Sequence, residues 1–267
     1  MEDYRLDVYL QTNSFIETRE KAKKLILNSC VYVNDKLITK PSFKVNVMDK
    51  VEVKNDFIYV SRGASKLEKA IKYFNIITEG KTAVDIGAST GGFTDFLIKN
   101  NANKVYAVDV GHGQLHKSLI ENNKVINMEG TNFRYIDMLI FKESIDIVTV
   151  DVSFISLGLI LPNIAKISHE LTDIVVLIKP QFEAGRGNIG KNGIVKDKKV
   201  HLSVLNDIQM YCAENHLYLK NITFSPIKGG DGNIEYLGHI NKGTEENSIS
   251  ENNFKDLVKQ AFEYYKK

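Results

Sequence analysis

The residues best suited to ligand chemistry lie in a glycine-rich segment at positions 84–94. The segment follows an apolar run typical of a buried strand and precedes a stretch with helical periodicity. Glycines at such a junction let the backbone approach a ligand closely, and the free N–H groups of the helix start can hold polar or anionic atoms. We therefore expect ligand contacts from seven residues of this segment: Asp85, Gly87, Ser89, Thr90, Gly91, Gly92 and Phe93.

Asp109 ends the next predicted strand, about twenty residues further on, where a carboxylate can accept hydrogen bonds from both hydroxyl groups of a ribose. The two features together predict a nucleoside cofactor. Because the glycine spacing departs from the G-x-G-x-x-G pattern that admits a pyrophosphate, S-adenosylmethionine fits better than NAD. Asn132, in the loop after the third predicted strand, is a further candidate contact to the adenosine.

Two other glycine motifs suggest competing interpretations. Gly87-x-Ser89-x-Gly91 matches the nucleophile elbow of α/β-hydrolases, but the sequence holds no HGG-type oxyanion loop, and a hydrolase would leave Asp109 unexplained. Residues 185–190 match G-x-G-x-x-G after a predicted strand, yet no acidic strand end follows at the required distance. For this second motif we favour a mobile loop over the active site.

Four charged residues stand at the ends of predicted elements: Lys66, Asp151, Lys179 and Glu235. Asp151 and Lys179 directly follow apolar strands, and ligands of an open parallel sheet bind outside the carboxyl ends of its strands. Asp151 is therefore also a candidate contact to the cofactor. Each charge alone is more often part of an ordinary ion pair, but four of them around one crevice indicate a catalytic cluster.

Short apolar runs alternate with helix-length spacers from about residue 81 onward. This alternation predicts an α/β fold with a doubly wound, mostly parallel, Rossmann-like sheet. The predicted strands are residues 83–86, 105–110, 125–128, 145–152, 174–178, 217–224 and 234–240. A helix over residues 61–74 precedes them, and we expect a capping box of Ser65 and Glu68 at its start and Lys66 on its exposed first turn.

Residues 1–58 form a separate predicted α+β unit that is too small for an enzyme. Thr18 can cap a helix with one apolar side and one basic side, the latter formed by Arg19, Lys23 and Lys24. Such a basic side is suited to RNA phosphates, with a solvated surface as the competing interpretation. The remaining divisions are a linker with a bridging helix at 59–80, a cofactor-binding domain at 81–241, and a polar tether with an amphipathic helix at 242–267. We favour docking of that last helix on its own domain over docking on a partner or a membrane surface.

Composition limits the remaining classes. The 267 residues are 43% hydrophobic and 25% charged, which excludes wholesale disorder, and the net charge of +2 neither requires nor excludes a nucleic acid. Cys30 and Cys212 lie too far apart in the sequence for a CxxC redox pair or a zinc knuckle. The first ten residues lack the pattern of an export signal, and no apolar run reaches the ~20 residues of a membrane span. We therefore expect a cytoplasmic protein with reduced thiols, no metal and no stable membrane span.

Over residues 1–241 the chain resembles the TlyA family, in which an S4 RNA-binding domain precedes an FtsJ-like 2'-O-ribose methyltransferase domain. The motifs that carry the resemblance occur in order at residues 5–7, 18–22, 31–34, 61–67, 85–94, 151–156, 178–183, 225–229 and 232–236. The resemblance implies a class I methyltransferase fold, S-adenosyl-L-methionine as cofactor, and cytidine 2'-hydroxyls of 16S and 23S ribosomal RNA, free or in ribosomal subunits, as substrates. It also implies that the Lys-Asp-Lys-Glu tetrad of these enzymes falls on Lys66, Asp151, Lys179 and Glu235. The expected RNA contacts are Arg5, Arg19, Lys23, Lys24 and Arg62.

A tetrad of this kind suits the reaction, because a ribose 2'-hydroxyl is a poor nucleophile and needs a base to take its proton. We assign Lys179 as that base, Lys66 as a neighbouring cation that favours its neutral form, and the two carboxylates as groups that orient the lysines and the ribose. Spacing alone leaves open which member takes the proton. Two alternative functions also stay open: a membrane-active protein, since members of this family have been called haemolysins, and a non-catalytic RNA-binding protein. The oligomeric state is not indicated.

Overall fold

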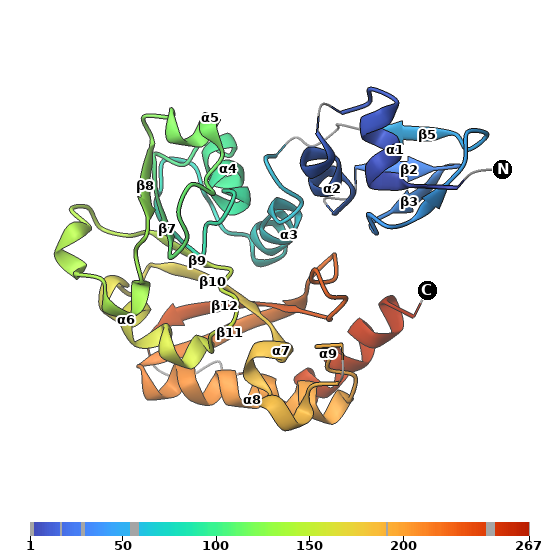
Figure 1. Cartoon of the computed structure of the whole chain (residues 1–267). Coiled ribbons are helices and arrows are strands. Elements are labelled where there is room, and N and C mark those ends of the chain that lie inside the picture. The colour runs from blue at the N-terminus through green and yellow to red at the C-terminus, as the bar shows by residue number, and fades with distance from the viewer. Residues whose placement is uncertain are drawn as a thin grey trace. The chain divides into compact units, whose positions relative to one another are not determined.

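The computed structural model describes residues 3–16, 18–27, 30–53, 59–190, 192–243 and 249–266, apart from the side chains of Lys24 and Arg186. The chain divides into two compact units, Met1–Arg62 and Gly63–Lys267 (Figure 1). The predicted RNA contacts all belong to the first unit, and the predicted catalytic and cofactor residues all belong to the second.

The described part of the first unit consists of two helices and short antiparallel strands. In chain order these are β1 (Tyr4–Arg5), α1 (Leu6–Thr12), α2 (Arg19–Leu27), β2 (Val31–Val33), β3 (Lys36–Ile38), β4 (Lys44–Val45) and β5 (Val51–Val53). Strand β2 lies between β3 and β5, and β1 pairs with β4. Asn34 and Asp35 join β2 to β3 with positive φ values of 50° and 62°, the conformation that matches the twist of a tight hairpin. The helices bury Leu6, Leu10 and Ile26 in a core of their own.

A seven-stranded sheet forms the centre of the second unit. Its strands are β6 (Thr82–Ile86), β7 (Lys104–Asp109), β8 (Val125–Glu129), β9 (Ile147–Val150), β10 (Asp173–Ile178), β11 (Leu217–Phe224) and β12 (Tyr236–Lys242). The strand order is β11-β12-β10-β9-β6-β7-β8, in which β12 is antiparallel to both neighbours and the other pairings are parallel. The predicted doubly wound α/β class is confirmed, and each predicted apolar run overlaps one of these strands.

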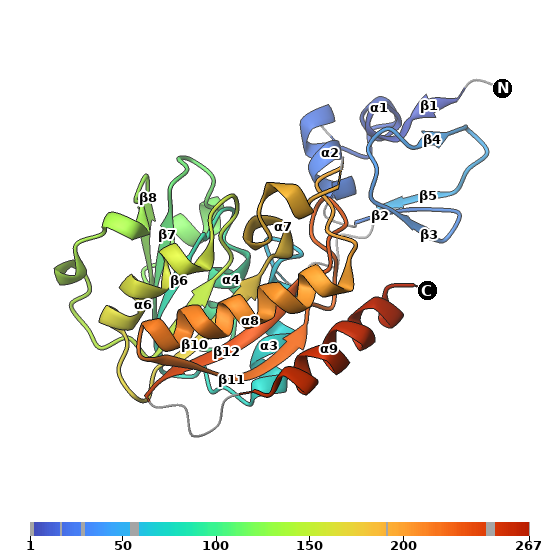
Figure 2. The same ribbon diagram turned by 90° about the horizontal axis from the view of Figure 1, so that it is seen from below.

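Helices cover both faces of this sheet. They are α3 (Ala64–Phe74), α4 (Gly92–Lys99), α5 (Lys117–Ile120), α6 (Leu161–Ile167), α7 (Pro180–Glu183), α8 (Lys198–Glu214) and α9 (Glu251–Tyr264), with 3-10 turns η1 (Phe133–Tyr135), η2 (Met138–Ile140), η3 (Leu157–Leu159) and η4 (Arg186–Asn188). Figure 2 shows α6 and α8 on one face and α3 and α4 on the other. Apolar side chains of the strands are consequently buried on both sides, as expected for parallel strands.

The start of α3 differs from the sequence-based expectation in two ways. The helix begins at Ala64 after Gly63, with no side-chain cap, so Ser65 lies inside its first turn and the predicted capping box is wrong. The prediction that Lys66 is exposed is also wrong, because the residue retains only 8% of its accessible surface. Its ammonium group is paired with Glu235, which is 169 positions later in the chain and beyond the reach of any local pattern.

Helix α9 docks on its own unit, as favoured from the sequence. A reciprocal capping box between Ser250 and Asn253 begins it, and Phe254 and Ala261 are fully buried against the core that α8 and the sheet share. Residues 244–248 of the predicted tether lie outside the described residues. Within the described part of the chain, no helix is long and apolar enough to cross a membrane.

Candidate active site

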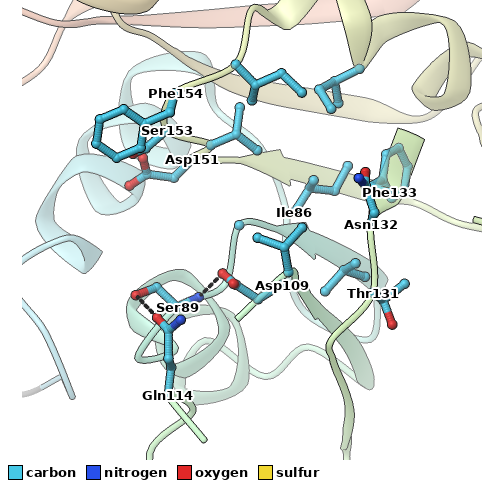
Figure 3. Close-up of a pocket in the computed structure, with 16 residues that line it drawn as sticks. Ile86, Ser89, Asp109, Gln114, Thr131, Asn132, Phe133, Asp151, Ser153 and Phe154 are labelled. Carbon is cyan, nitrogen blue, oxygen red and sulfur yellow. Dashed lines mark hydrogen bonds between the residues drawn. The ribbon is translucent and has the colours of Figure 1, made fainter. Parts of the chain in front are cut away.

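A cavity of about 330 Å³ opens at the carboxyl ends of β6, β7 and β9 (Figure 3). In the sheet, β6 lies between β7 and β9, and the strand order reverses at this position. Open α/β sheets bind their ligands at such a reversal, which is where the cavity lies. Its polar lining includes Ser89, Asp109, Gln114, Asn132 and Asp151.

The turn after β6 requires glycine at position 87. Gly87 has a φ of +84°, and a Cβ built there would lie 2.6 Å from the backbone oxygen of Asp151. Asp151 donates its backbone N–H to the carbonyl of Ile86 over 2.9 Å, so the ends of β6 and β9 are held together beside the cavity. The close backbone approach expected of the glycine-rich segment is therefore an approach to the end of β9.

Asp109 fastens the glycine turn to the end of β7. One carboxylate oxygen accepts the backbone N–H of Ser89 at 2.8 Å, drawn in Figure 3, and the other accepts that of Gly111 at 2.7 Å. A carboxylate oxygen has a second lone pair, so each can still accept a hydrogen bond from a ligand hydroxyl. Glu129, at the end of β8, accepts the N–H groups of Gln114 and Leu115 and so holds the neighbouring cavity wall.

Only part of the predicted cofactor set lines the cavity. Gly87, Ser89, Asp109, Asn132 and Asp151 do so, whereas the cavity lining does not include Asp85, Thr90, Gly91, Gly92 or Phe93. Gly92 and Phe93 form the buried start of α4 after Gly91, which has a φ of +92°, so this part of the segment shapes the turn. Sequence reasoning missed Gln114 and Thr131, which no motif marks, and also the apolar walls, part of which lie in the motifs 85–94 and 151–156.

Asp85 is fully buried beneath the cavity. Its carboxylate accepts the hydroxyl groups of Thr94 at 2.7 Å and Thr149 at 2.9 Å. Burial raises the pKa of Asp85 to about 6, and the nearby charge of Asp151 contributes in the same direction. Because the unfolded chain holds this carboxyl at its ordinary, lower pKa, ionisation opposes folding as the pH rises through that interval.

The Asp85→Asn variant is expected to gain stability relative to the parent chain as the pH rises. From pH 5 to pH 7.5, the unfolding free energy of the variant minus that of the parent should increase by about 1 to 2 kcal/mol. The reason is that the parent must bury an ionised carboxylate above pH 6. Urea unfolding at both pH values measures this, with exposed Asp256→Asn as the control. An equal change in unfolding free energy with pH for the parent and for Asp85→Asn would contradict the expectation.

The four predicted catalytic residues meet at the edge of the cavity as a chain of alternating charges. Lys66 Nζ lies 2.8 Å from Glu235 Oε2 and 4.0 Å from Asp151 Oδ2, and Lys179 Nζ lies 2.6 Å from Asp151 Oδ1. Asp151 alone of the four also lines the cavity. Helix α3 supplies Lys66, the carboxyl ends of β9 and β10 supply Asp151 and Lys179, and Glu235 directly precedes β12.

Electrostatics keep Asp151 ionised. Burial alone would raise its pKa, but the charges of Lys66 and Lys179 and the hydrogen bond from Lys179 outweigh that effect and lower the pKa below its usual range. The carboxylate lies between the two lysines, so the nearest charge to Lys179 is Asp151 rather than Lys66.

Two further polar side chains support this charge cluster and were missed from the sequence. Lys179 donates to Ser153 Oγ at 2.9 Å, and Gln181 donates to Glu235 Oε1 at 3.3 Å. Both belong to the motifs 151–156 and 178–183, so their positions in those motifs were the available signal.

An aromatic side chain stands at the rim of the cavity. Phe154 is 90% exposed, has a positive φ of 63°, and lies 4.8 Å from the ring of Phe182. Glu183 accepts hydrogen bonds from Ser156 Oγ and Leu157 N and thereby fixes the end of the loop that carries Phe154. The loop thus presents a large apolar surface to solvent beside the catalytic cluster (Figure 3).

In the first unit, Arg5 and Arg19 share the buried carboxylate of Asp7. Each guanidinium lies 3.0 Å from it, and both side chains remain partly exposed. Burial alone would raise the pKa of Asp7, but the hydrogen bonds from both arginines lower it instead. Lys23 lies on the same helix as Arg19, near Glu20, and Arg62 is partly buried at the end of the unit, while the side chain of Lys24 lies outside the described residues.

Comparison with known proteins agrees with this architecture. Residues 59–242 match the model of the FtsJ-like methyltransferases, and residues 5–51 match that of the S4 domain. YqxC from Bacillus subtilis (strain 168), named as a candidate rRNA methyltransferase, is 45% identical over 262 residues, which are 96% of this chain and 93% of the relative. The 16S/23S rRNA (cytidine-2'-O)-methyltransferase TlyA from Mycobacterium tuberculosis is 34% identical over 259 residues, 96% of each chain. A solved structure from Streptococcus thermophilus, described as a candidate hemolysin, is 41% identical with a TM-score of 0.79 and covers 100% of this chain and 98% of its own.

The matched residues include the glycine turn, the cavity and the whole cluster of alternating charges. The relatives align along nearly the entire length of both units. This chain belongs to the TlyA family of FtsJ-like methyltransferases that carry an S4 domain.

Proposed function

We propose that this chain transfers a methyl group from S-adenosylmethionine to the 2'-hydroxyl of a cytidine in ribosomal RNA. The observation that carries the proposal is the Lys66, Asp151, Lys179 and Glu235 cluster beside a cavity of cofactor type. The name of the mycobacterial relative, a 16S/23S rRNA (cytidine-2'-O)-methyltransferase, supports the choice of nucleotide and of RNA.

The residues of the cavity fit this cofactor. Asp109 has free lone pairs for two ribose hydroxyls, and Val110, Phe133 and Ile160 offer apolar surface to an adenine ring. Gly87 and Ser89 of the glycine turn line the cavity, where they can face the amino-acid part of the cofactor. When bound, S-adenosylmethionine supplies a methyl group that is activated by a sulfonium centre.

Lys179 serves as the base in this proposal. Lys179 is paired with Asp151 as an ammonium ion, so it must first release a proton to solvent to act as the base. As the ribose oxygen forms its bond to the methyl carbon, the hydroxyl proton then passes to Lys179 Nζ, and the electrons of the broken sulfur–carbon bond remain on the sulfur. Asp151 holds Lys179 in place from 2.6 Å. On its other side Asp151 faces Lys66 at 4.0 Å, and Glu235 holds Lys66 from 2.8 Å. Asp151 then stabilises the ammonium ion that Lys179 becomes.

The exposed ring of Phe154 supports a single-stranded or splayed-out RNA substrate. Unpaired bases stack on aromatic side chains, and a base stacked at this rim would bring its own ribose near Lys179. The ring of Phe182 lies behind Phe154 and 5.8 Å from Lys179 Nζ, which links the stacking surface to the proposed base.

In the first unit, the basic residues of the S4 domain bind the RNA backbone in this proposal. We expect the Lys23→Ala/Lys24→Ala double variant to bind ribosomal RNA about three- to tenfold more weakly at moderate salt. Because two phosphate contacts are lost, the slope of log affinity against log salt concentration should become shallower by about two. Filter binding at several salt concentrations measures this, while affinity for S-adenosylmethionine should not change. The matched control is Lys117→Ala/Lys124→Ala in the second unit, and equal RNA affinity of both variants would refute the role.

The function is tested by methyl transfer from labelled S-adenosylmethionine to small and large ribosomal subunits and to the free RNAs, followed by mapping of the modified nucleotide. A 2'-O-methylated cytidine is the expected product. Absence of transfer to every RNA would favour the non-catalytic alternative. The haemolysin alternative has little structural support, since the apolar face of α9 is buried in its own unit, and leakage of liposomes on adding the protein would revive it.

A further inference from the structure

The backbone that leads to Glu235 is anchored at Ser225, just after the end of β11. Ser225 is fully buried, and its N–H donates to the carbonyl oxygen of Glu235 at 2.9 Å. One residue earlier, the carbonyl of Phe224 accepts a hydrogen bond from Lys69 of α3 at 2.6 Å. The position of Glu235 therefore depends on how firmly the 224–225 segment is held.

Tyr265, at the end of α9, holds this segment from another direction. Its hydroxyl donates to the carbonyl oxygen of Ser225 at 2.7 Å, and its ring packs against Phe224 and beneath Lys228 Nζ, which lies 5.1 Å from the ring centre. These two backbone hydrogen bonds of Ser225 run in series, from the Tyr265 hydroxyl to the Ser225 carbonyl and from the Ser225 N–H to the Glu235 carbonyl.

Helix α9 is itself well anchored, so it can act as a support. Phe254 is fully buried near its start, and Phe262 lies edge-on to the buried ring of His201 at 5.0 Å near its end. His201 connects α8 to β12, because its ring nitrogens are paired with Tyr236 Oη and with the carbonyl oxygen of Val195. This helix lies beyond residues 59–242, the range matched by the methyltransferase family model.

We propose that Tyr265 is a positioning residue for the catalytic cluster, which aligns Glu235 with Lys66 through the backbone of Ser225. The proposal rests on the proposed function, because it treats Glu235 and Lys66 as catalytic. Loss of the Tyr265 hydroxyl leaves a buried carbonyl without its donor and frees the start of β12 to shift. A small displacement of Glu235 loosens Lys66, and with it the Asp151 carboxylate that holds Lys179.

The adjacent residue offers a matched control. Tyr264 is 53% exposed and contacts the rings of Phe224 and Tyr265, and within the described part of the chain its hydroxyl has no hydrogen-bond partner. Tyr264→Phe and Tyr265→Phe therefore remove the same atom from neighbouring positions of the same helix end. Only the second removes the bond to Ser225.

Steady-state methyl transfer to the best RNA substrate is the first measurement. For Tyr265→Phe we expect kcat to fall about three- to tenfold with KM for both substrates unchanged, because the loss is confined to the alignment of catalytic groups. The kcat of Tyr264→Phe should stay within about twofold of that of the parent, because the lost hydroxyl lies at the surface. In a Glu235→Gln background, Tyr265→Phe should cause no further loss. Equal kcat values for the two tyrosine variants, or a full additional loss in that background, would overturn the proposal.

Amide hydrogen exchange provides a measurement that does not depend on activity. Exchange at the Ser225 amide should become faster in Tyr265→Phe and remain unchanged in Tyr264→Phe, since only the first weakens the segment that donates to Glu235. Unchanged exchange in Tyr265→Phe would overturn the proposal even if the enzyme is active. A parent chain that methylates no RNA would instead refute the proposed function, while the exchange result would still decide whether Tyr265 holds the segment.

Discussion

Replacing Lys179 with alanine is expected to lower the rate of methyl transfer by about 10²- to 10⁴-fold, the range for loss of a general base. The affinity for S-adenosylmethionine should change little, because Lys179 is not among the residues that line the cavity. Single-turnover methyl transfer measures the first effect and equilibrium binding of the cofactor measures the second.

Two controls separate chemistry from folding in the Lys179→Ala experiment. Removing one partner of a buried pair leaves Asp151 less well compensated, so the melting temperature of the variant must be compared with that of the parent. Lys117→Ala removes an exposed lysine of α5 and should retain full activity. Turnover near the parent rate in a folded Lys179→Ala protein would exclude Lys179 as the base and direct attention to the other lysine of the cluster, Lys66.

Gly87→Ala is expected to reduce cofactor affinity by at least about tenfold and to lower the unfolding free energy by about 3 kcal/mol. Two effects add at this position. The φ of +84° is unfavourable for alanine, and the new methyl group would lie 2.6 Å from the backbone oxygen of Asp151, where no flexible side chain can move away. The end of β9 must shift, and Asp151 shifts with it. Cofactor titration and urea unfolding measure the two effects.

Gly80→Ala is the matched control for that variant. Gly80 also has a positive φ, of +73°, but a Cβ there has no neighbour within 4 Å. It should therefore cost about 1 kcal/mol of stability from backbone strain alone and leave cofactor binding unchanged. Similar stability and affinity in both variants would show that the close approach of β6 to β9 does not matter for the cavity.

Features of this protein that depend on neighbouring residues were predictable from the sequence. Alternation of apolar runs with helical spacers predicts the sheet, and the strand ends place Asp109, Asp151 and Lys179 at one edge of it. The positions of these residues follow from topology, because carboxyl ends of parallel strands meet on the same side. The glycine-rich segment and Asp109 predicted the cofactor, whereas the reaction came from the resemblance to the TlyA family.

Features that depend on distant residues were not predictable. The burial of Lys66 requires Glu235, and the position of Asp85 beneath the cavity requires hydroxyl groups from both α4 and β9. Likewise, nothing in the basic pattern of α2 indicates that Arg19 shares the carboxylate of Asp7 with Arg5. Local periodicity assigns a residue to a face of its own element, whereas tertiary partners decide whether that face is solvated.

The separation of the chain at Arg62 and Gly63 has a consequence for how such an enzyme can diversify. The basic residues proposed to hold the RNA backbone belong to the first unit, whereas the residues proposed to do the chemistry, and Phe154 beside them, belong to the second. Substitutions in the first unit can therefore change which ribosomal RNAs are retained, and for how long, without altering the barrier to methyl transfer. A covalently attached RNA-binding unit also raises the local concentration of any weakly recognised target around the second unit. Substrate range and catalytic rate can then be selected independently, in two parts of one polypeptide.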